Sequence, residues 1–195
     1  MQSFVSLSQC VAHAAHLARV AHADQRYGDA AYMTHVRAVA SVCQIAGERT
    51  AAVGYLHDVC EDSDMTPQDL RAAGFDSFIA TSVELLTRPA GMRYHDYIAR
   101  FGEFPYTDGM LVSAYDTAYE PAYGQPMARI VKLADNLHHT SFYRLGVQVP
   151  EDKRSLYERY MRAQEALVAM CNSELVEKMT AHMDRLVARQ LHTSV

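Results

Sequence analysis

The sequence predicts an all-α protein. Apolar residues recur at the three- and four-residue steps of a helix along nearly the whole chain, and almost no stretch alternates with the two-residue period of a half-buried strand. With 195 residues, of which 49% are hydrophobic and 21% charged, the chain is long enough to bury a core. We therefore expect residues 1–195 to form one helical-bundle domain, in which residues 151–195 are a C-terminal helical extension.

The first three helices are defined by apolar stripes and a stop residue. Val11, Ala15 and Ala18 repeat at helical spacing and should face inward, which leaves His22 on the flank or the surface. Gly47 separates the second helix from the third, because glycine commonly ends a helix. The predicted ranges are 8–25, 32–46 and 48–61.

Capping residues and further stripes define the later helices. Thr66 can cap a helix and Pro67 suits its first position, while Gly74 closes this short segment. Pro150 opens a long helix with a core stripe from Leu156 to Met170. The remaining helices are predicted over residues 77–87, 94–101, 127–143 and 173–189.

Two features leave alternatives open. In the last helix Leu175, Met179 and Leu186 should pack against the preceding helix, and this pair either packs back on the bundle or forms the seam of a homodimer. Segment 104–125 is rich in tyrosine, proline and glycine and predicts a long loop, which is either a pocket lid or a surface excursion.

Composition excludes several classes of protein. The net charge is −5, the sequence pI is about 6.0 and basic residues are not clustered, which argues against a nucleic-acid partner. The four cysteines have no Cys-x-x-Cys spacing, as expected of reduced thiols. No signal peptide and no apolar run of membrane-spanning length is recognisable, so we expect a soluble cytoplasmic protein without a membrane partner.

The most informative stretch is His57-Asp58-Val59-Cys60-Glu61-Asp62. On a helix Asp58 faces Glu61 and Asp62, and the stripe formed by Val53 and Leu56 draws His57 toward the interior. A buried cluster of imidazole and carboxylate groups needs a cationic partner, for which a divalent metal ion is suited. The stretch therefore predicts a metal site with acidic groups beside it.

Two distant residues extend this prediction. His35 and Asp135 each lie beside an apolar stripe, so three helices can send His35, His57 with Asp58, and Asp135 into one interior pocket. Imidazole with carboxylate suits manganese, iron, zinc or cobalt, and no cysteine belongs to the set. Taken singly, His35 or Asp135 is more typical of a bundle with hydrogen-bonded core histidines and a solvated acidic helix end, and only the joint pattern favours a metal site.

The chain resembles the HD-domain metal-dependent phosphohydrolases, in particular the hydrolase domains of RelA/SpoT homologues and the small stand-alone alarmone hydrolases. The matching residues cover most of the chain: Ala21-His22-Ala23-Asp24-Gln25-Arg26, Tyr32, His35, His57 to Ser63, Thr66, Leu85-Leu86-Thr87-Arg88 and Val131-Lys132-Leu133-Ala134-Asp135. The resemblance implies an HD-domain bundle with one divalent ion in its core, usually manganese, held by His35, His57, Asp58 and Asp135.

The resemblance also implies roles for other residues. Glu61 and Asp62 match the acidic pair that activates the attacking water, and Arg26 matches a residue that lines the nucleotide pocket. Lys132 stands in the family's Lys-Leu-Ala-Asp string, and we expect it to bind the substrate or to have a structural role. His139 stands where the family usually has asparagine, and its imidazole can still form a hydrogen bond near the site. Further departures are the missing lysine and Asp-Gly in residues 27–31 and Val36 in place of a proline.

A metal-dependent nucleotide phosphohydrolase is therefore predicted. By resemblance the substrate is guanosine tetraphosphate (ppGpp), from which the 3'-pyrophosphate is released, while the ion activates water and Glu61 and Asp62 move protons. Of the cationic residues available to bind phosphates, Arg26 ranks before Arg88, Arg93 and Lys132. The alternatives are hydrolysis of another nucleotide or a 3'-phosphorylated cofactor, or a non-catalytic nucleotide-sensing module.

Overall fold

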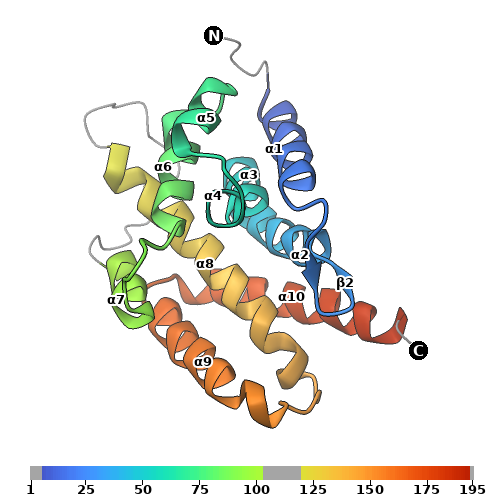
Figure 1. Ribbon diagram of the computed structural model, residues 1–195. Helices are drawn as coiled ribbons and strands as arrows, with labels where there is room; N and C mark the ends of the chain where they lie inside the picture. Colours follow the sequence, from blue (N-terminus) through green and yellow to red (C-terminus); the bar gives the residue numbers. More distant parts are fainter. Residues whose placement is uncertain (1–5, 103–119, 194–195) are drawn as a thin grey trace.

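A computed structural model describes residues 6–102 and 120–193. The described residues form helices and one two-stranded hairpin, which confirms the predicted all-α class (Figure 1). The helices are α1 (Leu7–Ala21), α2 (Met33–Cys43), α3 (Glu48–Leu56), α4 (Val59–Asp62), α5 (Pro67–Ala72), α6 (Ser77–Leu86), α7 (Tyr94–Ala99), α8 (Glu120–Arg144), α9 (Arg154–Ala169) and α10 (Ser173–Thr193). Short 3-10 turns are η1 (Gln44–Ala46), η2 (Arg100–Gly102) and η4 (Glu151–Lys153).

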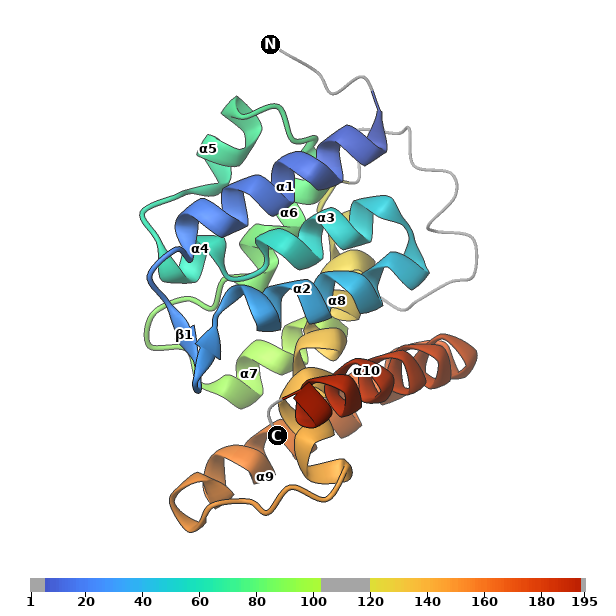
Figure 2. The ribbon, with the colours of Figure 1, turned by 90° about the vertical axis from the view of Figure 1, so that its right-hand side faces the viewer.

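Helix α8 is the centre of the bundle. It packs against α2, α3 and α6 on one side and against α9 and α10 on the other, while α1 packs on α3 (Figures 1 and 2). Fully buried aliphatic side chains from several helices meet in one core: Val36 and Val39 of α2, Val53 and Leu56 of α3, Ile79 and Val83 of α6, and Leu133 and Leu137 of α8. The helices that carry the predicted ligands share this core. Close packing therefore holds their backbones in fixed positions, from which the ligand side chains project.

Local capping explains several helix starts. Ser6 and Gln9 form a capping box at the start of α1, and Thr66 and Asp69 form another at the start of α5, where Pro67 takes the first turn as predicted. Each box satisfies backbone N–H groups that a helix start leaves without an intrahelical partner.

The predicted helix over residues 48–61 is broken in the structure. Helix α3 ends at Leu56, His57 is its C-cap, and Asp58 is the N-cap of the one-turn helix α4. On a continuous helix two successive side chains point about 100° apart. The break at this pair allows both His57 and Asp58 to face the interior.

A hairpin that was not predicted follows α1. The expected helix to residue 25 stops at Ala21, and the chain forms β1 (Arg26–Tyr27) and β2 (Ala30–Ala31), paired antiparallel. Gly28 adopts a φ of 58° in the two-residue loop, a conformation that glycine takes without strain. The hairpin places the Tyr27 ring against His35 in the first turn of α2. His22, expected at the surface, is instead buried at 1% exposure beside Tyr32.

The two C-terminal helices pack back on the bundle. Helix α9 buries Ala163 and Leu167 mainly against α8, and α10 buries Met179 and Met183 against α8 and α2. Their main contacts in the described residues are therefore with the bundle, and not with each other as predicted. A homodimer stays a prediction.

The predicted loop 104–125 is described only in part. Residues 103–119 lie outside the described residues, while the structure begins α8 at Glu120, seven residues before the predicted start at Met127. Among the described helices, none combines the length and the apolar character needed to cross a membrane.

Candidate metal centre

The four predicted ligands come together in the core. His35 projects from α2, His57 and Asp58 from the α3–α4 break, and Asp135 from α8. The Nε2 atom of His35 lies 3.2 Å from Nε2 of His57, 3.8 Å from Oδ2 of Asp58 and 3.4 Å from Oδ1 of Asp135. Nε2 of His57 lies 2.9 Å from the same Asp58 oxygen. His35 therefore has a contact with each of the other three candidate ligands.

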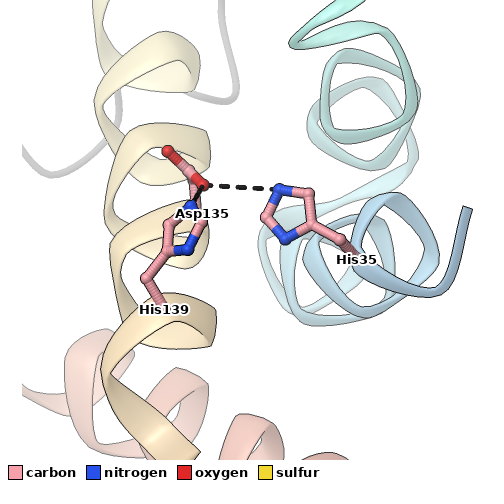
Figure 3. Close-up of side chains that lie close together, drawn as sticks. All are labelled: His35, Asp135 and His139. Atoms are coloured by element: carbon pink, nitrogen blue, oxygen red, sulfur yellow. Dashed lines mark ion pairs between the residues drawn. The ribbon is translucent and has the colours of Figure 1, made fainter. Parts of the chain in front are cut away.

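The donor atoms fall into two sets that share His35. His35, His57 and Asp58 form one set, with their ligand atoms within 4.8 Å of one another. His35, Asp135 and His139 form the other, within the same distance. Figure 3 shows this second set. Two donors that bind one ion at about 2.0–2.2 Å lie about 3 Å apart at right angles and about 4.4 Å apart at most. The measured separations within each set fit this range, so each set can hold a divalent ion.

Further contacts orient the two imidazoles. Nδ1 of His57 lies 2.9 Å from the carbonyl oxygen of Gly54, so its N–H donates there and Nε2 turns to the site. Nδ1 of His35 lies 3.0 Å from Nδ1 of His138, a buried histidine of α8. The bond from His57 to a backbone carbonyl is typical of a histidine whose other nitrogen serves as a metal ligand.

The carboxylates are held as well. Tyr32 donates a hydrogen bond of 2.6 Å to Oδ2 of Asp58, and Nζ of Lys132 lies 2.8 Å from Oδ2 of Asp135. The second oxygen of Asp135, Oδ1, is the one that faces His35 and His139. Each carboxylate thus has a fixed orientation toward the site.

Burial and charge act in opposite directions on the first set of donors. Burial lowers the pKa of His35, and the imidazoles of His138 and His139 add to this effect. Burial also lowers the pKa of His57, but the Asp58 carboxylate outweighs it and raises the pKa to about 9. The attraction of His57 in turn holds the pKa of Asp58 below its usual range in spite of burial. The cluster attracts positive charge.

The same balance applies around Asp135. Burial would raise the pKa of this carboxyl, but the Lys132 ammonium and the His139 imidazole hold it well below its usual range. Burial lowers the pKa of Lys132, but the Asp135 carboxylate raises it by more. The net shift is upward, so the lysine is charged.

A pocket of about 380 Å³ opens beside the candidate ligands. Asp58, Asp135 and His139 line it, together with the predicted catalytic Glu61. Oε1 of Glu61 accepts a hydrogen bond from the backbone N–H of Arg88, and partial burial raises the pKa of this carboxyl. A pocket of this volume is in the range of small-molecule sites.

Asp62, the other predicted catalytic residue, lies outside the described lining of this pocket. It follows Glu61 at the end of α4, and its backbone carbonyl accepts a hydrogen bond from Gln25. Partial burial and the nearby Asp58 raise the pKa of its carboxyl.

The cationic residues of the pocket differ from the predicted ranking. Arg26, ranked first, is exposed in the hairpin, donates to the carbonyl of Asp29 and lies outside the described lining. Lys132 is part of the lining, as are Arg88 and Arg93. Sequence reasoning missed Arg159 of α9, which lies over the Tyr94 ring at 4.8 Å from its centroid.

Aromatic rings form much of the remaining wall, and sequence reasoning did not assign them to the site. They are Tyr27, Tyr32, Tyr94, Tyr97 and Tyr160. The spacing of the stripe from Leu156 to Met170 predicts Tyr160 as a core residue, because a tyrosine at such spacing is usually packed inside. The only sequence signal for a site role was its neighbour Arg159, a cation directly beside a stripe position.

Comparisons with known proteins support the fold. No family model matches the chain, and no curated protein matches it in sequence. A solved structure of a metazoan protein, described as an orthologue of SpoT that hydrolyses ppGpp and plays a role in starvation responses, superposes with a TM-score of 0.58 at 17% sequence identity. The match covers 97% of this chain and 98% of that one. This chain therefore has the all-α HD-domain fold of that hydrolase over nearly its whole length.

Proposed function

We propose that this protein is a metal-dependent nucleotide phosphohydrolase. The observation that carries the proposal is that His35 lies close to His57, Asp58 and Asp135 in the core, beside a pocket lined by a further carboxylate and several cations. Such a combination can bind an ion, a water molecule and phosphate groups side by side. A purely structural site has no need of the open pocket.

The substrate proposed first is ppGpp, from which the 3'-pyrophosphate would be released to give GDP and pyrophosphate. The sequence resemblance supports it, and so does the solved hydrolase with the same fold, whose description names ppGpp. The pocket chemistry is compatible, because Arg88, Arg93 and Arg159 can bind phosphates and tyrosine rings can stack on a purine base. These cations offset a net charge of −5 that would otherwise repel an anionic nucleotide.

The residues have separate roles in this proposal. A divalent ion held by the four ligands would polarise the phosphoryl group and lower the pKa of water. Glu61, as a carboxylate on the pocket wall, accepts the proton of the attacking water, and Asp62 supports it from the next position. Lys132 keeps Asp135 in place and adds positive charge where the phosphates bind.

The metal is proposed to be a divalent transition ion. Manganese is the ion implied by the resemblance, and iron, zinc and cobalt suit the same imidazole and carboxylate donors. Elemental analysis of the purified protein identifies the resident ion.

A nucleotide panel tests the proposed function. Metal-loaded protein is incubated with ppGpp, nucleoside monophosphates, nucleoside triphosphates and a 3'-phosphorylated cofactor, and pyrophosphate and phosphate are measured separately. Pyrophosphate release from ppGpp supports the proposal in full. Turnover of another compound, but not of ppGpp, would change the proposed substrate and leave the assignment as a hydrolase in place. Tight nucleotide binding without turnover of any compound overturns the enzymatic assignment in favour of a sensing module.

A further inference from the structure

His139 has the position of a metal ligand. It lies one helical turn after Asp135 on α8, so both side chains project from the same face. Its Nε2 atom lies 3.1 Å from Oδ1 of Asp135, and the same oxygen lies 3.4 Å from Nε2 of His35 (Figure 3). Two nitrogens thus face one carboxylate oxygen from two different helices.

Each of these separations alone fits either a hydrogen bond or a shared ion. The three donor atoms taken together favour a shared ion. Ligands of one ion with bonds of about 2.1 Å lie about 3.0 Å apart at 90° and about 3.4 Å apart at a tetrahedral angle. Both measured distances agree with these values, and the donor atoms of His35, Asp135 and His139 all lie within 4.8 Å of one another. A hydrogen bond between His139 and Asp135 alone does not require the His35 nitrogen to be there as well.

The imidazole of His139 is held in this orientation. Its Nδ1 lies 2.9 Å from the hydroxyl of Tyr27, and its ring stacks on Tyr160 with centroids 4.4 Å apart and planes 1° apart. The tyrosine oxygen can accept a hydrogen bond from Nδ1–H, which leaves the lone pair of Nε2 free for a metal ion. Tyr27 also stacks on His35, at a centroid distance of 4.9 Å and an angle of 11°, so one side chain aligns both imidazoles.

Asp135 is oriented to share an ion with His139. Its Oδ2 atom is held by Lys132 at 2.8 Å, so only Oδ1 is turned to the two imidazoles. A monodentate carboxylate between two imidazoles leaves room for additional ligands around the ion.

We propose that His139 binds a divalent ion together with His35 and Asp135, and that it makes the site selective for ions that prefer imidazole. The inference rests on the proposed metal site and refines it. His139 then adds a second imidazole to His35 and the Asp135 carboxylate in this donor set, which favours Co²⁺ or Zn²⁺ over Mn²⁺.

Metal binding without substrate tests this assignment. The full chain is stripped of metal and titrated with Co²⁺ alone, followed by visible absorption, and with Mn²⁺ alone, followed by the electron paramagnetic resonance of the free ion. His139→Asn should weaken Co²⁺ binding by about tenfold or more and change the Co²⁺ spectrum, with a smaller effect on Mn²⁺. His95→Asn is the matched control, because His95 is 92% exposed, and it should leave both titrations unchanged.

The outcomes separate the inference from the function. An unchanged Co²⁺ spectrum and affinity in folded His139→Asn overturns the ligand assignment, even where the wild type hydrolyses nucleotides. A changed spectrum in a protein that turns over no nucleotide supports the assignment and counts against the hydrolase. A wild type that binds no ion overturns both. Should His139→Asn not fold, the same Co²⁺ titration of His139→Gln decides, since an unchanged spectrum and affinity overturn the proposal.

Discussion

The hydroxyl of Tyr32 donates a hydrogen bond of 2.6 Å to Oδ2 of Asp58, the same carboxylate oxygen that lies 2.9 Å from Nε2 of His57. Tyr32 precedes α2 and Asp58 precedes α4, so the bond ties two helix starts together at the candidate metal site. Burial first, then the adjacent Asp58 charge and this hydrogen bond, raise the pKa of the Tyr32 hydroxyl.

Tyr32→Phe should weaken metal binding by roughly tenfold to a hundredfold, because groups that orient a ligand typically contribute this much. The fold should persist, since the ring that packs on His22 is retained. Isothermal titration of the metal-free protein with Co²⁺ measures the effect. Tyr157→Phe, which removes a hydroxyl from α9 outside the described pocket lining, serves as the control. Equal affinities of both variants and the wild type would show that Tyr32 does not orient Asp58.

The separation of α2 and α3 is set by a glycine. A Cβ atom at Gly54 would lie 2.9 Å from the Cα of Ala40 and 3.2 Å from Sγ of Cys43, so the two backbones are too close for a side chain. Gly54→Ala should therefore push the helices apart, at a cost of about 1–3 kcal/mol in the free energy of unfolding.

The same change should reduce metal affinity, because His35 is on α2 and His57 follows α3. Urea denaturation of the metal-free protein and Co²⁺ titration measure the two effects. Gly102→Ala is a suitable comparison, since its Cβ would meet Cε of Met170 at 3.0 Å, the movable end of a side chain. A Gly54→Ala protein with normal stability and metal affinity would contradict this account of the helix contact.

Arg159→Gln should raise KM for the nucleotide by roughly tenfold with little change in kcat, because a charge-assisted hydrogen bond to phosphate contributes about 1.5–3 kcal/mol and this residue is at the exposed rim. Steady-state kinetics over a range of salt concentrations measure the change. Arg162→Gln removes an equal charge one turn later on α9, where the side chain is 70% exposed. Equal KM values for the two variants would show that Arg159 acts only through the overall charge.

Residue type and helical stripe were enough to predict that the four candidate ligands would lie close together in the core. His35 and Asp135 stand beside apolar residues on their own helices, and a buried helix face can point only into the core. The orientation of His57 and Asp58 was not predictable in the same way. It depends on a break of the helix at this pair, and the apolar pattern continues through that break without a proline or glycine to mark it.

The pocket wall depends on contacts between distant segments, which a periodic pattern does not contain. Arg159 reaches the pocket because α9 folds back on α8, and Arg26 is outside its described lining because a short hairpin takes it away from α1. His22 is buried for a related reason, since Tyr32 covers it after the same hairpin. Local spacing therefore determined which helix faces are buried, and tertiary packing determined which charged residues line the site.

Glu61→Gln should keep metal binding and lose about a hundredfold to ten-thousandfold in kcat, because the amide cannot accept a proton. Asp58→Ala should lose both, because Asp58 belongs to the ligand set. Metal titration and kcat are measured on both variants in parallel. Normal turnover by Glu61→Gln would remove Glu61 from the proton-transfer role and leave Asp62 as the remaining acidic candidate.

The pH dependence of the wild type gives an independent test of Glu61. Partial burial raises the pKa of its carboxyl, and the deprotonated form is the active base. As the pH falls, kcat should therefore decline at a higher pH than for an ordinary exposed glutamate, and remain constant above this range. Replacing Mn²⁺ by Co²⁺ separates the two groups that could cause the decline, since it changes the pKa of water at the ion but not that of Glu61. A midpoint that stays in place on metal exchange supports Glu61, while one that moves with the metal assigns the decline to the water.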